Sequence, residues 1–108
     1  MAKLETTLQG NFDEILTHIQ KGIMGGSISA TLEDASDFSD GYTRCSVRVF
    51  ERYSMIGSNR VSLSVTLFQG DSGVIRLSAI TSGGSQAMFF KFNTFGEEAF
   101  LDKLRALL

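Results

Sequence analysis

Five arginines are the side chains of this sequence best suited to binding an anion or a partner. They fall within consecutive predicted strands. They lie between residues 42 and 82, where only Glu51 and Asp71 oppose them, and are Arg44, Arg48, Arg52, Arg60 and Arg76. A guanidinium presents a planar fork of donors that matches a carboxylate or a phosphate group. The cluster therefore predicts a surface that binds a small anionic ligand or a partner. In the alternative interpretation, the arginine stems only cover a bare sheet face while their charged ends stay in water.

A glycine-rich loop is the second candidate site. It runs through Gly83, Gly84, Ser85 and Gln86. Successive backbone N–H groups in such a turn can surround an anion, and Ser85 and Gln86 would orient an anionic substrate while an arginine stabilises its charge. The loop has no trailing lysine and precedes a predicted strand, unlike a phosphate-binding P-loop. A flexible turn is the alternative interpretation.

Catalytic and metal chemistry have few candidates. His18 is the only histidine, and the helical pattern places it on an exposed face. Cys45 is expected to point inward as a small core residue rather than to act as a nucleophile. One histidine and one cysteine cannot form a metal-ligand cluster of the zinc type. The carboxylates of residues 33–40 do not have the two-residue spacing of a calcium loop. We predict no catalytic residue, no metal and no cofactor.

The alternation of apolar and polar residues over 60–68 predicts a strand with one buried face. Its outward side chains include Arg60, two serines and a threonine. The strand expected at 42–54 alternates in the same way, with Cys45, Val47 and Val49 inward and the arginines outward. The sequence thus predicts an open sheet face that is rich in arginine and hydroxyl groups.

Three large apolar residues, Phe50, Phe68 and Ile80, fall on the same face as the arginines if the alternation holds. Large apolar side chains on an open sheet are typical of a partner surface. The simplest partner is a second copy of the chain in a symmetric dimer, and a different protein is the alternative. A local bulge that turns these residues into the core is the other interpretation.

The elements that position these residues follow from caps, turns and periodicity. Asn11 with Glu14 forms a capping box before an apolar stripe at helical spacing, and Gly25-Gly26 ends this helix. Thr94 with Glu97 is expected to cap a final helix. Residues 33–41 are expected to form a polar connection. Strands are expected at 3–9, 27–33, 42–54, 59–69, 73–82 and 86–93. The last of these has both faces apolar, so it is either buried on both sides or paired across an interface.

These elements predict a single α+β domain over residues 1–108. The expected architecture is a two-layer sandwich, a mostly antiparallel sheet of five to six strands with two helices packed on one face, in the order β-α-β-β-β-β-β-α. Because a helix follows the first strand, that strand is expected to pair in parallel with a central strand.

Composition excludes several classes of function. The formal net charge is −2, which does not favour binding to nucleic acid. No apolar run approaches the roughly 20 residues of a membrane span, and the N-terminal residues have no apolar signal core. The single cysteine cannot form an internal disulfide. A cytoplasmic protein is the expectation.

The chain resembles a family of short bacterial proteins, mainly from Firmicutes, that is known only as a domain of unknown function. The resemblance covers nearly the whole chain and is carried by residues 32–37, 49–53, 59–63, 79–87 and 93–98. It implies a free-standing one-domain protein, and it implies no activity, ligand or catalytic residue.

The residues therefore support two functional hypotheses. The first is a non-catalytic binding or oligomerising module that uses the open sheet face, with the arginines as anion or partner contacts and Phe50 and Phe68 as apolar anchors. The alternative is a small enzyme that acts on an anionic molecule near residues 81–86.

Overall fold

The computed structural model describes residues 1–53, 60–83 and 90–108, and the side chains of the last range from residue 96 onward. In these residues the elements are β1 (Ala2–Leu8), α1 (Phe12–Gly25), β2 (Thr31–Asp40), β3 (Thr43–Tyr53), β4 (Arg60–Gln69), β5 (Ile75–Gly83) and α2 (Phe90–Arg105). The α+β class and the expected element order are confirmed for this part of the chain.

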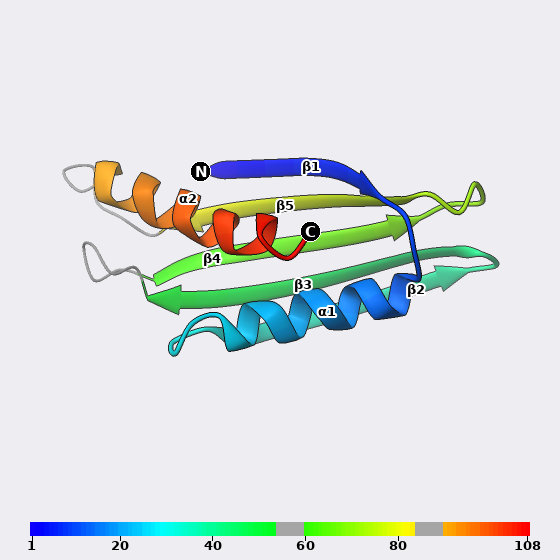
Figure 1. Cartoon of the computed structure of the whole chain (residues 1–108), viewed down its shortest axis with the longest axis horizontal. Helices are drawn as coiled ribbons and strands as arrows, with labels where there is room; N and C mark the ends of the chain where they lie inside the picture. The colour runs from blue at the N-terminus through cyan, green and yellow to red at the C-terminus, as the bar shows by residue number, and fades with distance from the viewer. Residues whose placement is uncertain (54–59, 84–89) are drawn as a thin grey trace.

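The described strands form one antiparallel sheet in the order β1-β5-β4-β3-β2. Both helices lie over the same face of this sheet, α1 along β3 and β2, and α2 along β4 and β5 (Figure 1). The expected parallel pairing of the first strand is wrong, because α1 carries the chain across the whole sheet and leaves β1 antiparallel to β5 at the opposite edge. The central strand is therefore β4, with two described strands on each side of it.

The core lies between the sheet and the two helices. The strand β4 contributes every second residue to it, from Val61 to Leu67, and β5 contributes Ile75, Leu77 and Ala79. The helices add a stripe from α1 and three residues from α2, namely Phe12, Leu16, Ile19, Ile23, Phe100, Leu101 and Leu104. The alternation over 60–68 thus predicted the buried face of β4 correctly.

The first helix forms as its sequence predicts. The side chain of Asn11 accepts a hydrogen bond of 2.9 Å from the backbone N–H of Glu14, which satisfies one of the unpaired donors of the first turn. At the other end the N–H of Gly26 donates to the carbonyl oxygen of Ile23 at 3.3 Å. The apolar stripe between these caps faces the core.

The polar connection expected at residues 33–41 is a strand, β2, and the strand expected at 27–33 begins only at Thr31. Ile28, which falls within the expected strand, is fully exposed in the turn before β2. The strand β2 is an edge strand, so most of its side chains lie exposed and show no apolar alternation. Its pairing with β3 shifts register between Leu32 and Asp34, as in a β-bulge.

The last helix begins at Phe90, so Thr94 lies inside α2 instead of capping it. Residues 90–93 are helical and not part of a strand, while residues 86–89 of the expected strand lie outside the described residues. A short run that is apolar on both faces does not distinguish a buried strand from a helix, which explains the error.

The core position most sensitive to truncation is in β4. Leu63 is fully buried against both layers, so Leu63→Ala is expected to lower the free energy of unfolding by about 2–5 kcal/mol, through lost burial and the cavity that remains. Urea unfolding at one protein concentration measures this change. Lys21→Ala on the exposed side of α1 is the control and should stay within about 0.5 kcal/mol of the parent. Equal midpoints for both variants would contradict the assigned core.

Candidate interaction surface

The sheet has a second face, turned away from α1 and α2, which we call the open face. Because the strands pair in register, residues of all five described strands line up in rows across this face. Three rows, read from β2 to β1, are Phe38-Cys45-Phe68-Arg76-Thr7, Ser36-Val47-Thr66-Ser78-Glu5 and Asp34-Val49-Ser64-Ile80-Lys3. No described helix or strand covers these rows.

The middle of the open face is apolar or carries short hydroxyl side chains. Val47 and Val49 of β3 are half-buried by their neighbours. Phe68 is 40% exposed and Ile80 is 41% exposed, whereas Phe38 on β2 is 65% exposed. Of the charged residues in these rows, Lys3, Glu5 and Asp34 stand at the borders, on β1 and β2, whereas Arg76 stands on the inner strand β5. An apolar centre with a polar rim is the composition of a protein–protein interface.

Two shallow hollows lie in the open face on opposite sides of β4. The larger, hollow A, measures about 550 Å³ and is bordered by Glu5, Thr7, Thr66, Phe68, Arg76 and Ser78. The smaller, hollow B, measures about 330 Å³ and is bordered by Asp34, Ser36, Val47 and Val49. The face is therefore not flat, and hollow A lies next to the protruding side chain of Phe68.

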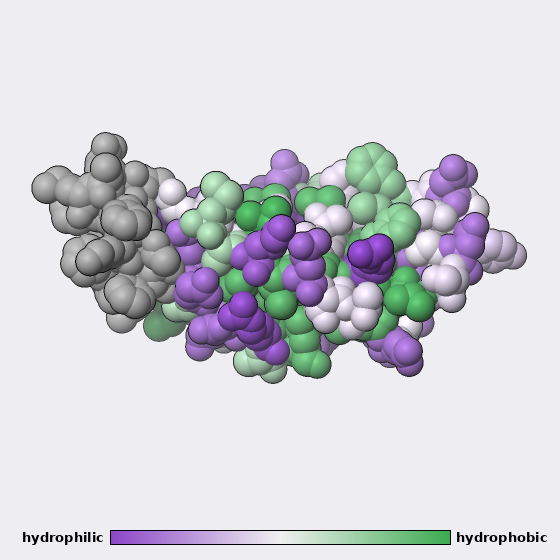
Figure 2. Space-filling model, turned by 90° about the horizontal axis from the view of Figure 1, so that it is seen from above, coloured by the Kyte–Doolittle hydropathy of each residue, from purple (hydrophilic) through white to green (hydrophobic). Residues whose placement is uncertain are grey.

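The edges of the sheet are less suited to binding than its open face. Lys3 and Glu5 on β1 are exposed and pair at 3.2 Å. Figure 2 shows hydrophilic and hydrophobic residues interspersed along the side of the molecule that includes β1. Charged side chains on an edge strand oppose the addition of another strand.

Three of the five arginines are not on the open face. In the β3–β4 register Phe50 lies opposite Leu63, and Val49 lies opposite Ser64. Residues directly opposite each other share a face, so Phe50 is fully buried beneath the helices. The predicted orientation of β3 is thus reversed: Arg44, Arg48 and Arg52 point toward the helices, while Cys45, Val47 and Val49 point to the open face.

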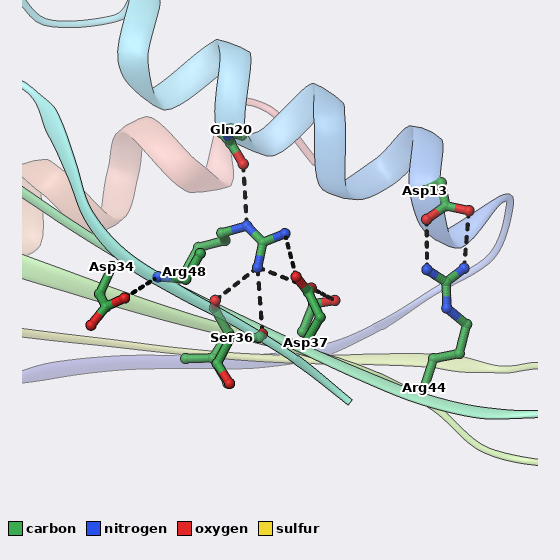
Figure 3. A network of polar contacts seen from close by, with 10 residues as sticks. Asp13, Gln20, Asp34, Ser36, Asp37, Arg44 and Arg48 are labelled. Carbon is green, nitrogen blue, oxygen red and sulfur yellow. Dashed lines mark hydrogen bonds and ion pairs between the residues drawn. The ribbon is translucent and has the colours of Figure 1, made fainter. Parts of the chain in front are cut away.

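Arg44 and Arg48 support α1 from below (Figure 3). Arg44 donates to both carboxylate oxygens of Asp13, at 3.0 and 2.6 Å, and lies 4.3 Å from the ring centre of Phe12. The side chain of Arg48 is only 11% exposed. It donates to Gln20 Oε1 at 3.2 Å and to Asp37 Oδ1 at 3.1 Å. These donors are already used, so neither arginine is placed to hold an added anion.

Arg52 also belongs to the helix side. Its guanidinium lies 4.5 Å from the ring centre of Phe100, a cation–π contact. Burial lowers the pKa of Arg52 from its ordinary value, but an arginine remains charged at any physiological pH.

The two remaining arginines lie on the open face, as predicted. Arg60 donates to Glu51 Oε1 at 2.6 Å and lies 4.9 Å from the ring centre of Tyr53; the hydrogen bond to Glu51 raises the pKa of Arg60. Arg76 is exposed and borders hollow A. Of the three large apolar residues predicted for this face, Phe68 and Ile80 are there and Phe50 is not.

The glycine-rich loop contributes little that can be described. Gly83 ends β5, and Gly84, Ser85 and Gln86 lie outside the described residues.

His18 is exposed on α1, as predicted, with Nε2 at 2.9 Å from the carbonyl oxygen of Leu107. Within residues 1–53, 60–83 and 90–108, no three His, Cys, Asp or Glu side chains gather as metal ligands. None of the helices in this part of the chain has the length and apolar character to cross a membrane.

Sequence reasoning missed the contribution of β2 to the open face. Phe38 and Asp34 fall in the segment that was expected to be a connection. One signal was present: Asp40-Gly41 is a dipeptide typical of a tight hairpin turn. Gly41 has φ of +62°, a conformation that glycine adopts without strain, and the turn joins β2 to β3.

The ion pairs on the sheet face covered by the helices predict that the folded state loses stability in acid. The hydroxyl of Ser46 donates to Asp37 at 2.6 Å, and this bond, together with those from Arg48, lowers the pKa of Asp37. The hydrogen bonds from Arg44 likewise lower the pKa of Asp13. A carboxyl whose folded pKa is depressed stabilises the fold above its unfolded pKa, and this contribution is lost as the pH falls through the folded pKa.

A family model matches residues 1–108, the full length of the chain, and describes a family of unknown function, DUF6054. No curated protein matches the chain.

We expect the free energy of unfolding to fall as the pH is lowered from about 5 to about 3, around the unfolded aspartate pKa. The double variant Asp13→Asn with Asp37→Asn should be less stable than the parent at pH 7 and should show a shallower slope across this window. Chemical denaturation at several pH values measures both. Asp40→Asn, whose carboxylate accepts from neither Arg44 nor Arg48 in the described structure, should keep the parent slope. An unchanged slope in the double variant would contradict the assigned ion pairs.

Proposed function

The chain belongs to the family of unknown function DUF6054, and we propose that it is a non-catalytic interaction module whose open face binds the surface of a protein. The observation that supports this proposal is the combination of uncovered apolar side chains with a polar border on one sheet face. Phe38, Phe68 and Ile80 protrude there, and the border residues are charged.

The size of the open face suits this function. Neighbouring strands lie about 4.8 Å apart, and each residue adds about 3.3 Å to the length of a strand. The described strands therefore form a face about 24 Å wide and about 30 Å long, or about 700 Å². A standard protein interface buries about 800 Å² on each partner. Soluble proteins seldom leave a contiguous apolar patch larger than a few hundred Å² without a function for it.

The hydroxyl side chains of β4 explain how such a face can also exist in water. Ser62, Ser64 and Thr66 alternate with core residues and remain half-buried. Their hydroxyls can bond to water when the face is free, and their small size lets a partner approach closely. This composition favours an interface that can form and separate over a permanently buried one.

Small-anion binding has less support than a protein partner. Arg44 and Arg48 bond to Asp13 and Asp37, and Arg60 bonds to Glu51. Arg76 is left at hollow A, where Glu5 also stands and would repel an anion. The enzyme alternative rests on the loop that continues through residues 84–86, outside the described residues, and no described contact favours it.

The proposal is tested by the size of the protein in extracts of the cells that naturally contain it. We expect the tagged parent chain to elute from a sizing column well above the 11.8 kDa of one chain. The double variant Val47→Arg with Phe68→Arg should elute as one chain, because it places two charges in the centre of the apolar face.

Thr17→Arg, on the exposed side of α1, is the matched control and should elute like the parent. Circular dichroism of the purified variants checks that each is folded. A parent chain that elutes as a free monomer in the extract would overturn the proposed function.

A further inference from the structure

We infer that the partner that fits the open face is a second copy of this chain, packed face to face about a two-fold axis parallel to β4. This inference rests on the proposed function and names its partner. Four observations lead to it: the central position of β4, the rows across the face, the two hollows and the charges of the two edges.

The central position of β4 makes the face self-complementary. Two described strands lie on each side of β4 in the order β1-β5-β4-β3-β2. A two-fold axis between the sheets and parallel to β4 places β4 opposite itself, β3 opposite β5 of the second copy, and β2 opposite β1. Such an isologous contact closes after two copies. Aligned sheets pack in this manner about 10 Å apart, with their mean strand directions within about 30° of each other.

The hollows then meet the protruding apolar residues. Under this rotation each row meets itself in reverse. In one row, Phe38 comes to lie over Thr7 of the second copy, beside Arg76 of that copy, and both of these residues border hollow A. In another row, Ile80 comes to lie over Val49 of the second copy, which borders hollow B. One symmetry operation thus fills both hollows, and Phe68 meets its own copy on the axis.

The edge charges match in the same arrangement. The row that begins with Asp34 and ends with Lys3 places Lys3 opposite Asp34 at both ends of the interface. Glu5 meets the hydroxyl side chain of Ser36. Arg60 meets its own copy at the end of β4, where Glu51 at 2.6 Å balances its charge in each chain.

The other face-to-face symmetry is disfavoured by the same charges. An axis in the plane between the sheets but perpendicular to the strands would place β2 against β2. Asp34 and Asp40 both point to the open face from β2, so this arrangement would bring two acidic edges together. Like charges brought together in an interface oppose association. The charge pattern therefore selects the axis parallel to β4.

Cysteine cross-linking of the purified full-length chain tests this geometry. In a Cys45→Ser background, Thr66→Cys lies on the axis and is expected to form a disulfide-linked dimer by itself, as facing strands of a sandwich can. Val47→Cys and Ser78→Cys are each displaced from the axis, too far from their own copies for a disulfide. Neither should cross-link alone, but a mixture of the two chains should, because Val47 faces Ser78 of the second copy.

Light scattering of the parent chain is expected to give twice the mass of one chain. Phe38→Ala should raise the dissociation constant of the dimer about tenfold or more, since each dimer loses two aromatic anchors. Tyr42→Ala removes an even more exposed aromatic from the β2–β3 turn, outside the rows, and should leave the constant within about twofold of the parent.

The outcomes separate this inference from the proposed function. A purified parent chain that stays monomeric and does not cross-link through Thr66→Cys overturns the dimer, whereas the proposed function fails only if the chain is also monomeric in its own cell extract. Cross-linking of Val47→Cys alone, without Thr66→Cys, overturns the axis parallel to β4.

Discussion

The antiparallel register between β3 and β4 decides which side chains of this protein meet the helices and which meet water. Phe50 lies opposite Leu63, so the phenylalanine of β3 enters the core and its two neighbours turn away. A shift by one residue would exchange the two faces of β3. It would bury Val49 and expose Phe50, and it would also place Arg48 on the open face. Both the support beneath α1 and the character of the open face therefore follow from this one pairing.

Arginines can point toward the helices because the aliphatic part and the guanidinium of each side chain lie in different surroundings. The side chains of Arg44 and Arg48 lie on the face of β3 that is turned toward α1, and that of Arg48 is only 11% exposed. Their guanidinium groups reach the border of this layer and bond to Asp13, Gln20 and Asp37. Asp37 comes from β2, so Arg48 also connects the edge strand to the helix above it (Figure 3). The side chains of Asp13 and Asp37 are 68% and 60% exposed, and salt bridges with exposed partners add little stability one by one; their main effect here is to position α1.

The composition of the open face follows from the orientation of β3. With the arginines on the other side, β3 presents two valines and a cysteine outward, beside the hydroxyls of β4 and the exposed rings of Phe38 and Phe68. In residues 1–53, 60–83 and 90–108 both helices lie on one side of the sheet, and no described element covers the other side. Because apolar surface gains free energy when it leaves water, this side is where binding to another molecule gains most.

The class of the fold, the first helix with its Asn11 cap and the buried face of β4 could all be predicted from the sequence. They depend on local spacing and on an alternation of apolar and polar residues that allows only one assignment of the buried face. The sequence also placed Arg60, Arg76, Phe68 and Ile80 on the open face correctly. Only the tertiary structure decided the orientation of β3, since both of its faces carry apolar residues and the choice depends on the register with β4. The same holds for β2, whose polar edge position removes any alternation, and for α2, where a run of apolar residues suits a helix and a strand equally.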